Sequence, residues 1–264
     1  MFRPYLIGRR YDTDARRVID YMASVSVAPS KSYQNIIDQV MRVRKNLGEH
    51  QRDYVFYHWA AETETQALIN WTSPGTFTLT KAGTVTHAAN RGFTASGANA
   101  DGLQSTFNPS TAGVGTNDVS VEVYSRTTSA AGARNAWGGA TSAAIVGRLR
   151  NTGDVANFRL NMTASVSLPS GITNTTGLWS HLRNATTVAQ VCQNGVQVGS
   201  DIVVVDQAAS NQNWNWLNAV IGTNASSTDQ IAYARICRAM TVARTLEHYQ
   251  SAILPLMQWN GANV

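Results

Sequence analysis

Apolar residues in the first part of the chain recur every three or four positions, which is the spacing of an amphipathic helix. Val18, Ile19 and Met22 follow this spacing and predict a helix over residues 13–24. Residues 1–12 show no such period, so we expect them to form an extended arm in front of the helix.

A second helix is predicted over residues 32–47, where apolar side chains again share one face: Tyr33, Ile36, Ile37, Val40 and Leu47. Ser30 or Ser32 can cap its start, and Gly48 can end it. So narrow an apolar stripe must pack on something. The partner is either the rest of this chain or another protein.

The pattern changes near Tyr54, where short β-prone segments begin to alternate with turn clusters. The expected strands are 54–59, 76–80, 84–87, 119–126, 145–150, 157–162, 179–183, 187–192, 196–198, 217–221 and 230–237. Residues 119–126 alternate strictly between apolar and polar, which predicts a half-buried strand. Many short strands at intervals near ten residues are typical of a sandwich or barrel.

The end of the chain gives the clearest local signals. Asn194 and Gly195 stand between two short strands and supply the two positive-φ residues of a type I′ hairpin turn. The strand over 230–237 leads into a helix predicted over 241–254, which begins at a threonine cap and ends before Pro255.

Charge adds an asymmetry to this picture. Only 14% of the residues are charged, and the net charge is +5. Residues 1–52 hold ten of the 21 basic and five of the 16 acidic side chains, which leaves eleven of each in the remainder. This excess of positive charge in residues 1–52 suits an acidic partner surface. The alternative is that the basic residues form a solvated helix face. The candidate anchoring residues are Arg3, Arg9, Arg10, Arg16 and Arg17.

Several classes of protein are disfavoured by the sequence. Without a long Lys/Arg block or a known motif, the basic arm argues against nucleic acid as the partner. Without a run of eighteen apolar residues, no membrane span is expected, and the first residues lack the apolar core of a secretory signal. The histidines and cysteines have no metal-ligand spacing, so neither a metal nor another cofactor is expected.

Short segments in a fixed order carry a resemblance to a known family. After the helical segments VIDYMASVSV and YQNIIDQVMRV come YVFYHW, QALINW, TLTKAGTVTHAANRGFTASGANADGLQSTFNPS, VSVEVYSR, CQNGVQVG, NAVIGTN and QIAYARICRAMTVARTLEHYQSAI. The ordered set resembles tailed-bacteriophage structural proteins that carry a concanavalin A-like, or laminin-G-like, lectin domain. It covers roughly residues 13–257. The polar segment LGEHQRD departs from the family, which is more apolar there, and the family offers no catalytic or binding residues to transfer.

The resemblance implies a mainly β fold. A concanavalin A-like jelly-roll sandwich would follow the extended arm and two short helices, and a short helix would close the chain. The expected division is a basic arm and helical anchor over 1–52 and a jelly-roll domain over 53–264. The implied function is a non-enzymatic structural protein of the virion, such as a head fibre, collar or tail-associated decoration. Its partners would be other virion proteins and, because appendages occupy symmetric positions, further copies of itself.

A carbohydrate-binding module that recognises a host surface glycan is the alternative function. Trp214 and Trp216 stand two residues apart among amides, and in a strand they would share one face as a stacking platform. Trp137 lies in a Gly-rich segment and is the other candidate for an exposed ring. Packing in the core or at a subunit interface is the competing interpretation for all three.

Four acidic residues are candidates for a catalytic or calcium site. Glu62 and Glu64 have the i, i+2 spacing of paired glycosidase carboxylates on a strand, although AETETQ equally fits a loop or a helix start. Asp101 and Asp118 are in loops of the kind that hold calcium at the rim of such sandwiches, and ordinary turns explain them as well.

The two cysteines, Cys192 and Cys237, each fall in a predicted strand. They would meet across the sandwich as a disulfide only with suitable geometry. Two buried free thiols are the alternative, since Cys is among the most buried residue types.

Overall fold

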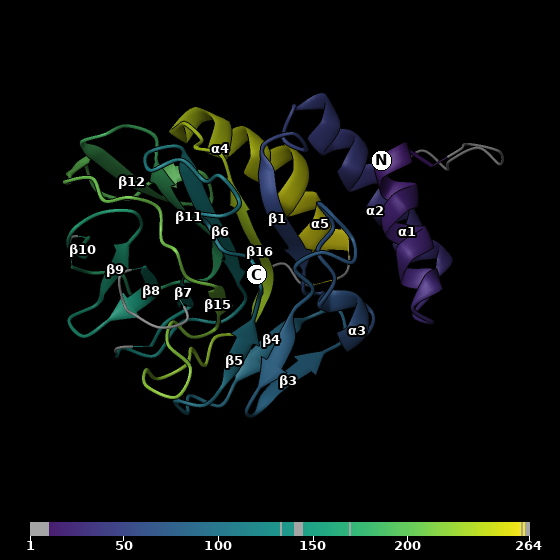
Figure 1. The fold of residues 1–264 in the computed structure, drawn as a ribbon, viewed down its shortest axis with the longest axis horizontal. Coiled ribbons are helices and arrows are strands. Elements are labelled where there is room, and N and C mark those ends of the chain that lie inside the picture. The colour runs from purple at the N-terminus through teal and green to yellow at the C-terminus, as the bar shows by residue number, and fades with distance from the viewer. Residues whose placement is uncertain (1–10, 133, 140–144, 169, 260, 262–264) are drawn as a thin grey trace.

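The computed structural model describes residues 11–132, 134–139, 145–168, 170–259 and 261. Two antiparallel sheets form a sandwich, and helices cover the outer face of one of them (Figure 1). The predicted fold, a mainly β sandwich with an N-terminal pair of helices and a helix near the C-terminus, is confirmed. Over the described ranges, no helix has the length and hydropathy to span a bilayer.

The first sheet has the order β13-β12-β11-β6-β16-β4-β3, with β1 also paired to β16 and β14 to β12. Its strands are β1 (Asp53–His58), β3 (Val85–Ala88), β4 (Gly92–Ala95), β6 (Val119–Ser125), β11 (Gly177–Arg183), β12 (Val188–Gln193), β13 (Val196–Gln197), β14 (Ile202–Val203) and β16 (Ile231–Cys237). The central strand β16 comes last in the chain, and β1 beside it comes first.

The second sheet has the order β10-β9-β8-β7-β15-β5-β2. Its strands are β2 (Thr80–Ala82), β5 (Gly102–Gln104), β7 (Trp137–Gly139), β8 (Val146–Asn151), β9 (Val155–Arg159), β10 (Val166–Ser167) and β15 (Trp214–Trp216). The two sheets enclose the aromatic core, to which Trp59, Trp137, Trp214 and Trp216 contribute.

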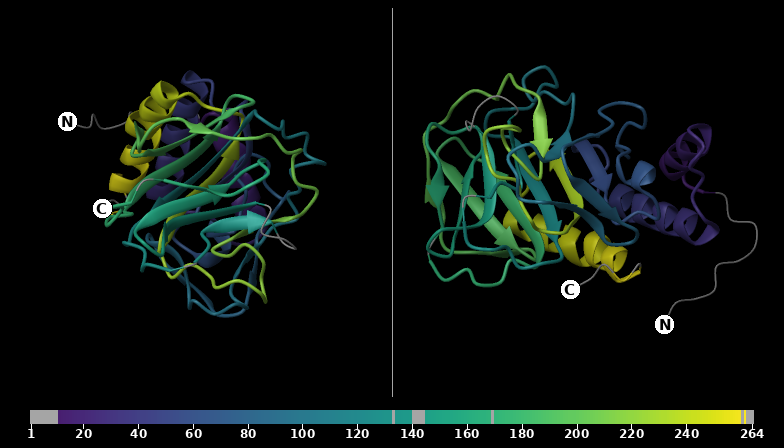
Figure 2. Two further views of the ribbon diagram at one scale, coloured as in Figure 1. Left: turned by 90° about the vertical axis from the view of Figure 1, so that its left-hand side faces the viewer. Right: turned by 90° about the horizontal axis from the view of Figure 1, so that it is seen from below.

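The N-terminal helices match the predicted spans and pack on this chain. They are α1 (Thr13–Ser24) and α2 (Lys31–Asn46), and in Figure 2 they lie at the end of the molecule away from the green strands. Ser30 caps α2 by accepting a hydrogen bond from the Tyr33 N–H, and Gly48 follows its end with φ +67°. The Tyr33 hydroxyl lies 2.8 Å from His58 Nδ1 on β1. The helical side chains thus join the core of the sandwich, and the domain division at residue 52 stays a prediction.

The C-terminal helical segment extends further than predicted. It comprises α4 (Val242–His248), a π-helical turn (Tyr249–Ile253) and α5 (Leu254–Trp259), and Thr241 caps it as expected. The prediction that the helix ends before Pro255 is wrong. Proline lacks the N–H of a regular α-helical bond and its ring crowds the preceding turn, and the wider π turn before it accommodates both effects.

Three strand predictions are also wrong. Of the expected strand over 76–80 only Thr80 lies in a strand, β2, because Phe77 has φ +57° and turns the chain before it. Every residue of β6 is buried, so the alternating segment is not a half-buried strand. Its second face is covered by the C-terminal helical segment. Residues 217–221 form no strand, because Leu217 has φ +61° and turns the chain at the end of β15. Leu217 and Ala219 are buried in loop packing, and Val220 and Ile221 are partly exposed.

The hairpin prediction is confirmed. Asn194 and Gly195 have φ values of +52° and +79° and join β12 to β13. A Cβ on Gly195 would lie 2.4 Å from the Leu246 Cα, so the hairpin approaches α4 more closely than a side chain permits.

Candidate functional site

The three candidate sugar-stacking tryptophans lie in the core. Trp137 on β7 and Trp214 and Trp216 on β15 are each at most 1% exposed. The Trp137 and Trp214 rings stack with centroids 5.3 Å apart, and Trp216 meets Trp59 edge to face at 5.7 Å. Positions two apart on β15 do share a face, but that face points between the sheets. The platform interpretation is therefore wrong, and core packing is the correct alternative.

The carboxylates of Glu62 and Glu64 both make contacts that hold helices in place. Glu62 accepts hydrogen bonds from the Ser30 hydroxyl and, at 2.9 Å, from the Ser30 N–H. Glu64 is the first residue of α3 (Glu64–Ala67) and pairs with Lys81 at 2.9 Å. Neither residue lies on a strand, so the alternate-strand-position geometry of paired glycosidase carboxylates does not apply to them. The helix-start interpretation of AETETQ is correct.

Asp101 and Asp118 organise separate parts of the chain. Asp101 accepts hydrogen bonds from the N–H groups of Thr84 (2.7 Å) and Ser96 (2.9 Å). Asp118 accepts one from the Ala239 N–H at 2.8 Å. Within the part of the chain that the structure describes, no three His, Cys, Asp or Glu side chains gather as metal ligands would. These contacts support the turn interpretation of both residues.

The two cysteines are buried free thiols on one sheet. Cys192 lies on β12 and Cys237 on β16, with β11 and β6 between them. Three strand spacings amount to about 14 Å, which is too far for a disulfide. Burial raises the pKa of each thiol to about 12. The disulfide interpretation is therefore wrong, and the free-thiol alternative is confirmed.

Two of the five candidate anchoring arginines lie in described residues, on the exposed side of α1. Arg16 pairs with Asp20 at 3.4 Å, with both side chains 66% exposed. Arg17 donates to the Thr72 carbonyl at 2.9 Å and is half exposed. Arg3, Arg9 and Arg10 fall outside the described residues. The two visible guanidinium groups thus face solvent in this structure.

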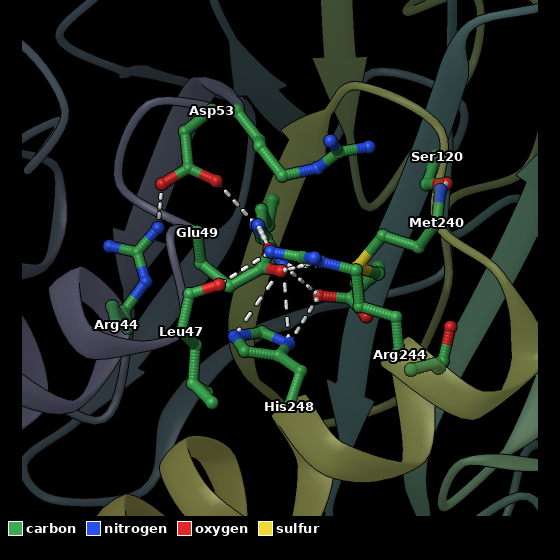
Figure 3. A network of polar contacts seen from close by, with 12 residues as sticks. Arg44, Leu47, Glu49, Asp53, Ser120, Met240, Arg244 and His248 are labelled. Atoms are coloured by element: carbon green, nitrogen blue, oxygen red, sulfur yellow. Dashed lines mark hydrogen bonds and ion pairs between the residues drawn. The ribbon is translucent and has the colours of Figure 1, made fainter.

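A buried charge network, which the sequence did not predict, joins the N-terminal helices to the sandwich and to the C-terminal helical segment (Figure 3). Arg235 on β16 stands at its centre, fully buried. Its guanidinium contacts Asp53 at 2.5 Å and Glu122 at 3.1 Å, and it also pairs with Glu49. The outer members are Arg44, paired with Asp53; Arg244, paired with Glu49; and His248, 3.3 Å from Glu122.

The network is balanced in charge. Its carboxylates belong to Glu49, Asp53 and Glu122, and its guanidinium groups to Arg44, Arg235 and Arg244. Burial, together with the charge of Arg235, lowers the pKa of His248. Burial alone would raise the pKa of Glu122, but His248, Arg235 and Ser180 outweigh it and hold that pKa far below its usual range. Such balance marks a structural junction, because each buried charge has a partner.

The second missed feature is a hollow of about 340 Å³ at the edge of the second sheet. Side-chain amides and a hydroxyl dominate its lining: Asn161, Gln207, Ser210, Asn211 and Gln212. Asn161 comes just after β9, and the others lie in the loop between β14 and β15. Its sequence signal is the run of amides in QAASNQN, directly before Trp214.

Comparison with models of known families gave no match, and comparison with curated proteins gave none either. Solved structures do match. The botulinum neurotoxin type G receptor-binding domain has a TM-score of 0.54 at 12% identity, covering 75% of this chain and 51% of that chain. A structure of botulinum neurotoxin type C, whose cell entry depends on interaction with two ganglioside molecules, has a TM-score of 0.56 at 11% identity, covering 79% of this chain and 52% of that chain.

An enzyme chain also matches. A mutant sialidase of Trypanosoma rangeli has a TM-score of 0.54 at 10% identity, covering 85% of this chain and 39% of that chain. The chain thus spans about half the length of the toxin chains and less of the sialidase. Identities this low show the fold alone. This chain has the β-sandwich fold that toxin receptor-binding domains share.

Proposed function

We propose that this protein is a non-enzymatic structural component of a tailed-phage particle, and that its sandwich binds a host surface glycan. The observation that carries the binding role is geometric: a sandwich of the receptor-binding type has an amide-lined hollow at its edge. Amides suit sugar hydroxyls because each amide both donates and accepts hydrogen bonds. The carboxylates of Glu62 and Glu64 are engaged with Ser30 and Lys81, which supports a non-enzymatic role.

The binding role is tested with the full-length protein and a set of immobilised host polysaccharides. We expect saturable binding to at least one of them and no release of reducing ends on long incubation. Heat-unfolded protein is the control for nonspecific adhesion to the immobilised polysaccharides. Absence of binding to every host polysaccharide would contradict the glycan role, and release of reducing ends would contradict the non-enzymatic one.

The virion role is supported by the ordered resemblance to phage structural proteins and by the excess of positive charge in residues 1–52. The arm is the part suited to anchoring. The helices are integrated in the core, and Arg44 and Glu49 belong to the buried network. Removal of residues 1–52 would therefore unfold the protein. Only substitutions in the arm or at exposed helix positions can test anchoring.

The expected result of replacing Arg3, Arg9 and Arg10 together by serine is a folded protein that no longer enters particles. Incorporation is measured by mass spectrometry of purified virions, and folding by circular dichroism of the isolated variant. A matched variant carries serine at three exposed arginines or lysines outside residues 1–52. Normal incorporation of the arm variant, or absence of the wild-type protein from virions, would contradict the proposal.

A further inference from the structure

We infer that the glycan is a neutral sugar and that it binds in the hollow beside β9 and the β14–β15 loop. This inference rests on the proposed glycan-binding function and names its site and ligand class. The hollow has a volume of about 340 Å³. Pockets for small ligands begin at about this size, about 300 Å³.

No charged side chain is among the residues that line the hollow. The nearest charges along the chain are engaged within the protein. Arg159 donates from its Nε to the Met162 carbonyl at 2.8 Å and from a terminal nitrogen to Gln207 Oε1 at 2.9 Å. Asp206 pairs with the buried Arg183. A carboxylated or sulfated sugar would therefore find no free cation among these groups, whereas neutral hydroxyls match the amides.

Asn161, one of the residues that line the hollow, has a side-chain oxygen that protein atoms leave unsatisfied. The residue is 3% exposed, and its Nδ2 donates to the carbonyls of Gly115 (3.3 Å) and Thr116 (3.2 Å). Those two acceptors fix which end of the amide carries the nitrogen. Its Oδ1 is buried and has no hydrogen-bond partner among the described residues. Such an oxygen needs a donor, and a small local opening would let a sugar hydroxyl supply it.

Backbone bonds hold the loop of the hollow in shape. The Gln207 N–H donates to the Asn161 carbonyl at 3.1 Å, and the Ser110 N–H donates to the Ser210 carbonyl at 3.1 Å. Asn211 Oδ1 accepts from Asn108 Nδ2 at 3.2 Å. The loop is thus tied to β9 on one side and to residues 108–110 on the other. A site held this way loses little conformational entropy on binding.

The hollow also offers a way to block it without breaking any of these bonds. Ala209 lines it and carries no side-chain hydrogen bond, so Ala209→Phe would fill the space. Asn211→Leu is a different kind of change: it keeps the volume and removes the amide, and with it the hydrogen bond from Asn108 Nδ2. Ala89, exposed in the turn between β3 and β4, gives the matched control Ala89→Phe.

The experiment measures binding of the full-length protein to a neutral glucan, a neutral galactan, N-acetylglucosamine oligosaccharides, a sialylated oligosaccharide and a sulfated one. We expect a neutral probe to bind and Ala209→Phe to weaken it at least about tenfold, a loss of about 1.4 kcal/mol. Asn211→Leu should weaken it about fivefold, as expected for one hydrogen bond. Ala89→Phe should leave affinity unchanged.

The outcomes separate the two proposals. Glycan binding that survives Ala209→Phe would overturn the hollow as the site and leave the glycan-binding function standing. Stronger binding of the sialylated or sulfated probe, lost in Ala209→Phe, would overturn the neutral ligand. Absence of binding to all probes and all host polysaccharides would overturn the proposed function itself. Nitrogen-15 NMR spectra give a further test. Side-chain amide signals that shift when the neutral probe is added to wild type, but not when it is added to Ala209→Phe, would support both the glycan-binding function and the hollow as its site.

Discussion

The two faces of β6 are both buried, and they are buried by opposite chemistry. Val119, Val121 and Val123 face the other sheet and the aromatic core. Ser120 and Glu122, between them, face the helical layer, where Glu122 meets Arg235 and His248. One face gains stability by removing apolar area from water, and the other holds charges that must all be matched.

The comparison shows what an alternating strand pattern can tell. Alternation indicates that the two faces of a strand differ in polarity. It does not indicate that the polar face is exposed to solvent. In this fold Arg235 on β16 and His248 on α4 are the partners that allow Glu122 to be buried. The two faces should therefore respond differently to mutation, pH and salt.

The largest effect is expected at the centre of the network. Arg235→Met leaves Glu49, Asp53 and Glu122 buried with too little positive charge, so the free energy of unfolding should fall by about 5 kcal/mol. Urea unfolding at pH 7 measures it. The double variant Arg235→Met/Glu122→Gln should recover part of the loss, because it also removes one of the stranded charges. A loss below about 1 kcal/mol would show that the network contributes little.

The matching change on the inner face is Trp216→Ala. It opens a cavity among Tyr57, Trp59 and Trp214, and we expect a loss of about 4 kcal/mol. Unlike the network variant, this loss should be the same at pH 5.5 and pH 8 and at low and high salt. Trp216→Phe should lose less, since it keeps part of the ring. A clear salt dependence would contradict the contrast between the two faces.

A smaller effect concerns pH on the apolar side. Burial lowers the pKa of His181 to about 3, against an unfolded value near 6.5, so the ring is neutral in the fold. Stability from such a group is complete above the unfolded pKa and is lost as the pH falls toward the folded one. Between pH 7 and pH 5 the free energy of unfolding should fall by about 2 kcal/mol because of this histidine.

His181→Phe isolates that contribution. The pKa values of His58 and His248 are lowered as well, but both residues remain in the wild type and in the variant. Urea unfolding of wild type and variant at pH 7 and pH 5 gives the comparison. The variant should lose about 2 kcal/mol less than wild type over this range. Equal losses in the two proteins would mean that the ring is protonated inside the fold.

The smallest effect is expected at an exposed ion pair. Arg16 and Asp20 lie on the solvent side of α1 with most of each side chain in water. Arg16→Ser should change the free energy of unfolding by less than about 0.5 kcal/mol. The variant is thus a stability control for the network substitution. A loss approaching that of Arg235→Met would contradict the claim that burial makes the difference.

Local signals in the sequence were reliable where one short segment decides the structure. The helix over 13–24, the Ser30 cap and the Asn194–Gly195 hairpin follow from the periods, caps and turn residues of a few neighbours. The sandwich itself follows from the number and spacing of the short strands. The Pro255 prediction failed because a π turn, which has no simple sequence rule, let the helix continue.

Features that depend on distant partners could not be predicted. Arg235 and Glu49 are 186 residues apart, and nothing near either one indicates the other. The tryptophans of β15 were placed on one face correctly, but which face is inside depends on the second sheet. The amide-lined hollow combines Asn161 with a loop some fifty residues later, and irregular loops have no period to detect.

The order of strands has a consequence for how the protein is made. β1 emerges from the ribosome about 180 residues before its neighbour β16. At synthesis rates of about 5–20 residues per second, this strand waits about 10–40 seconds for its partner. During that time the edge of β1 that pairs with β16 and the carboxylate of Glu49 lack their partners, so nascent chains should depend on chaperones until residues 231–237 are released.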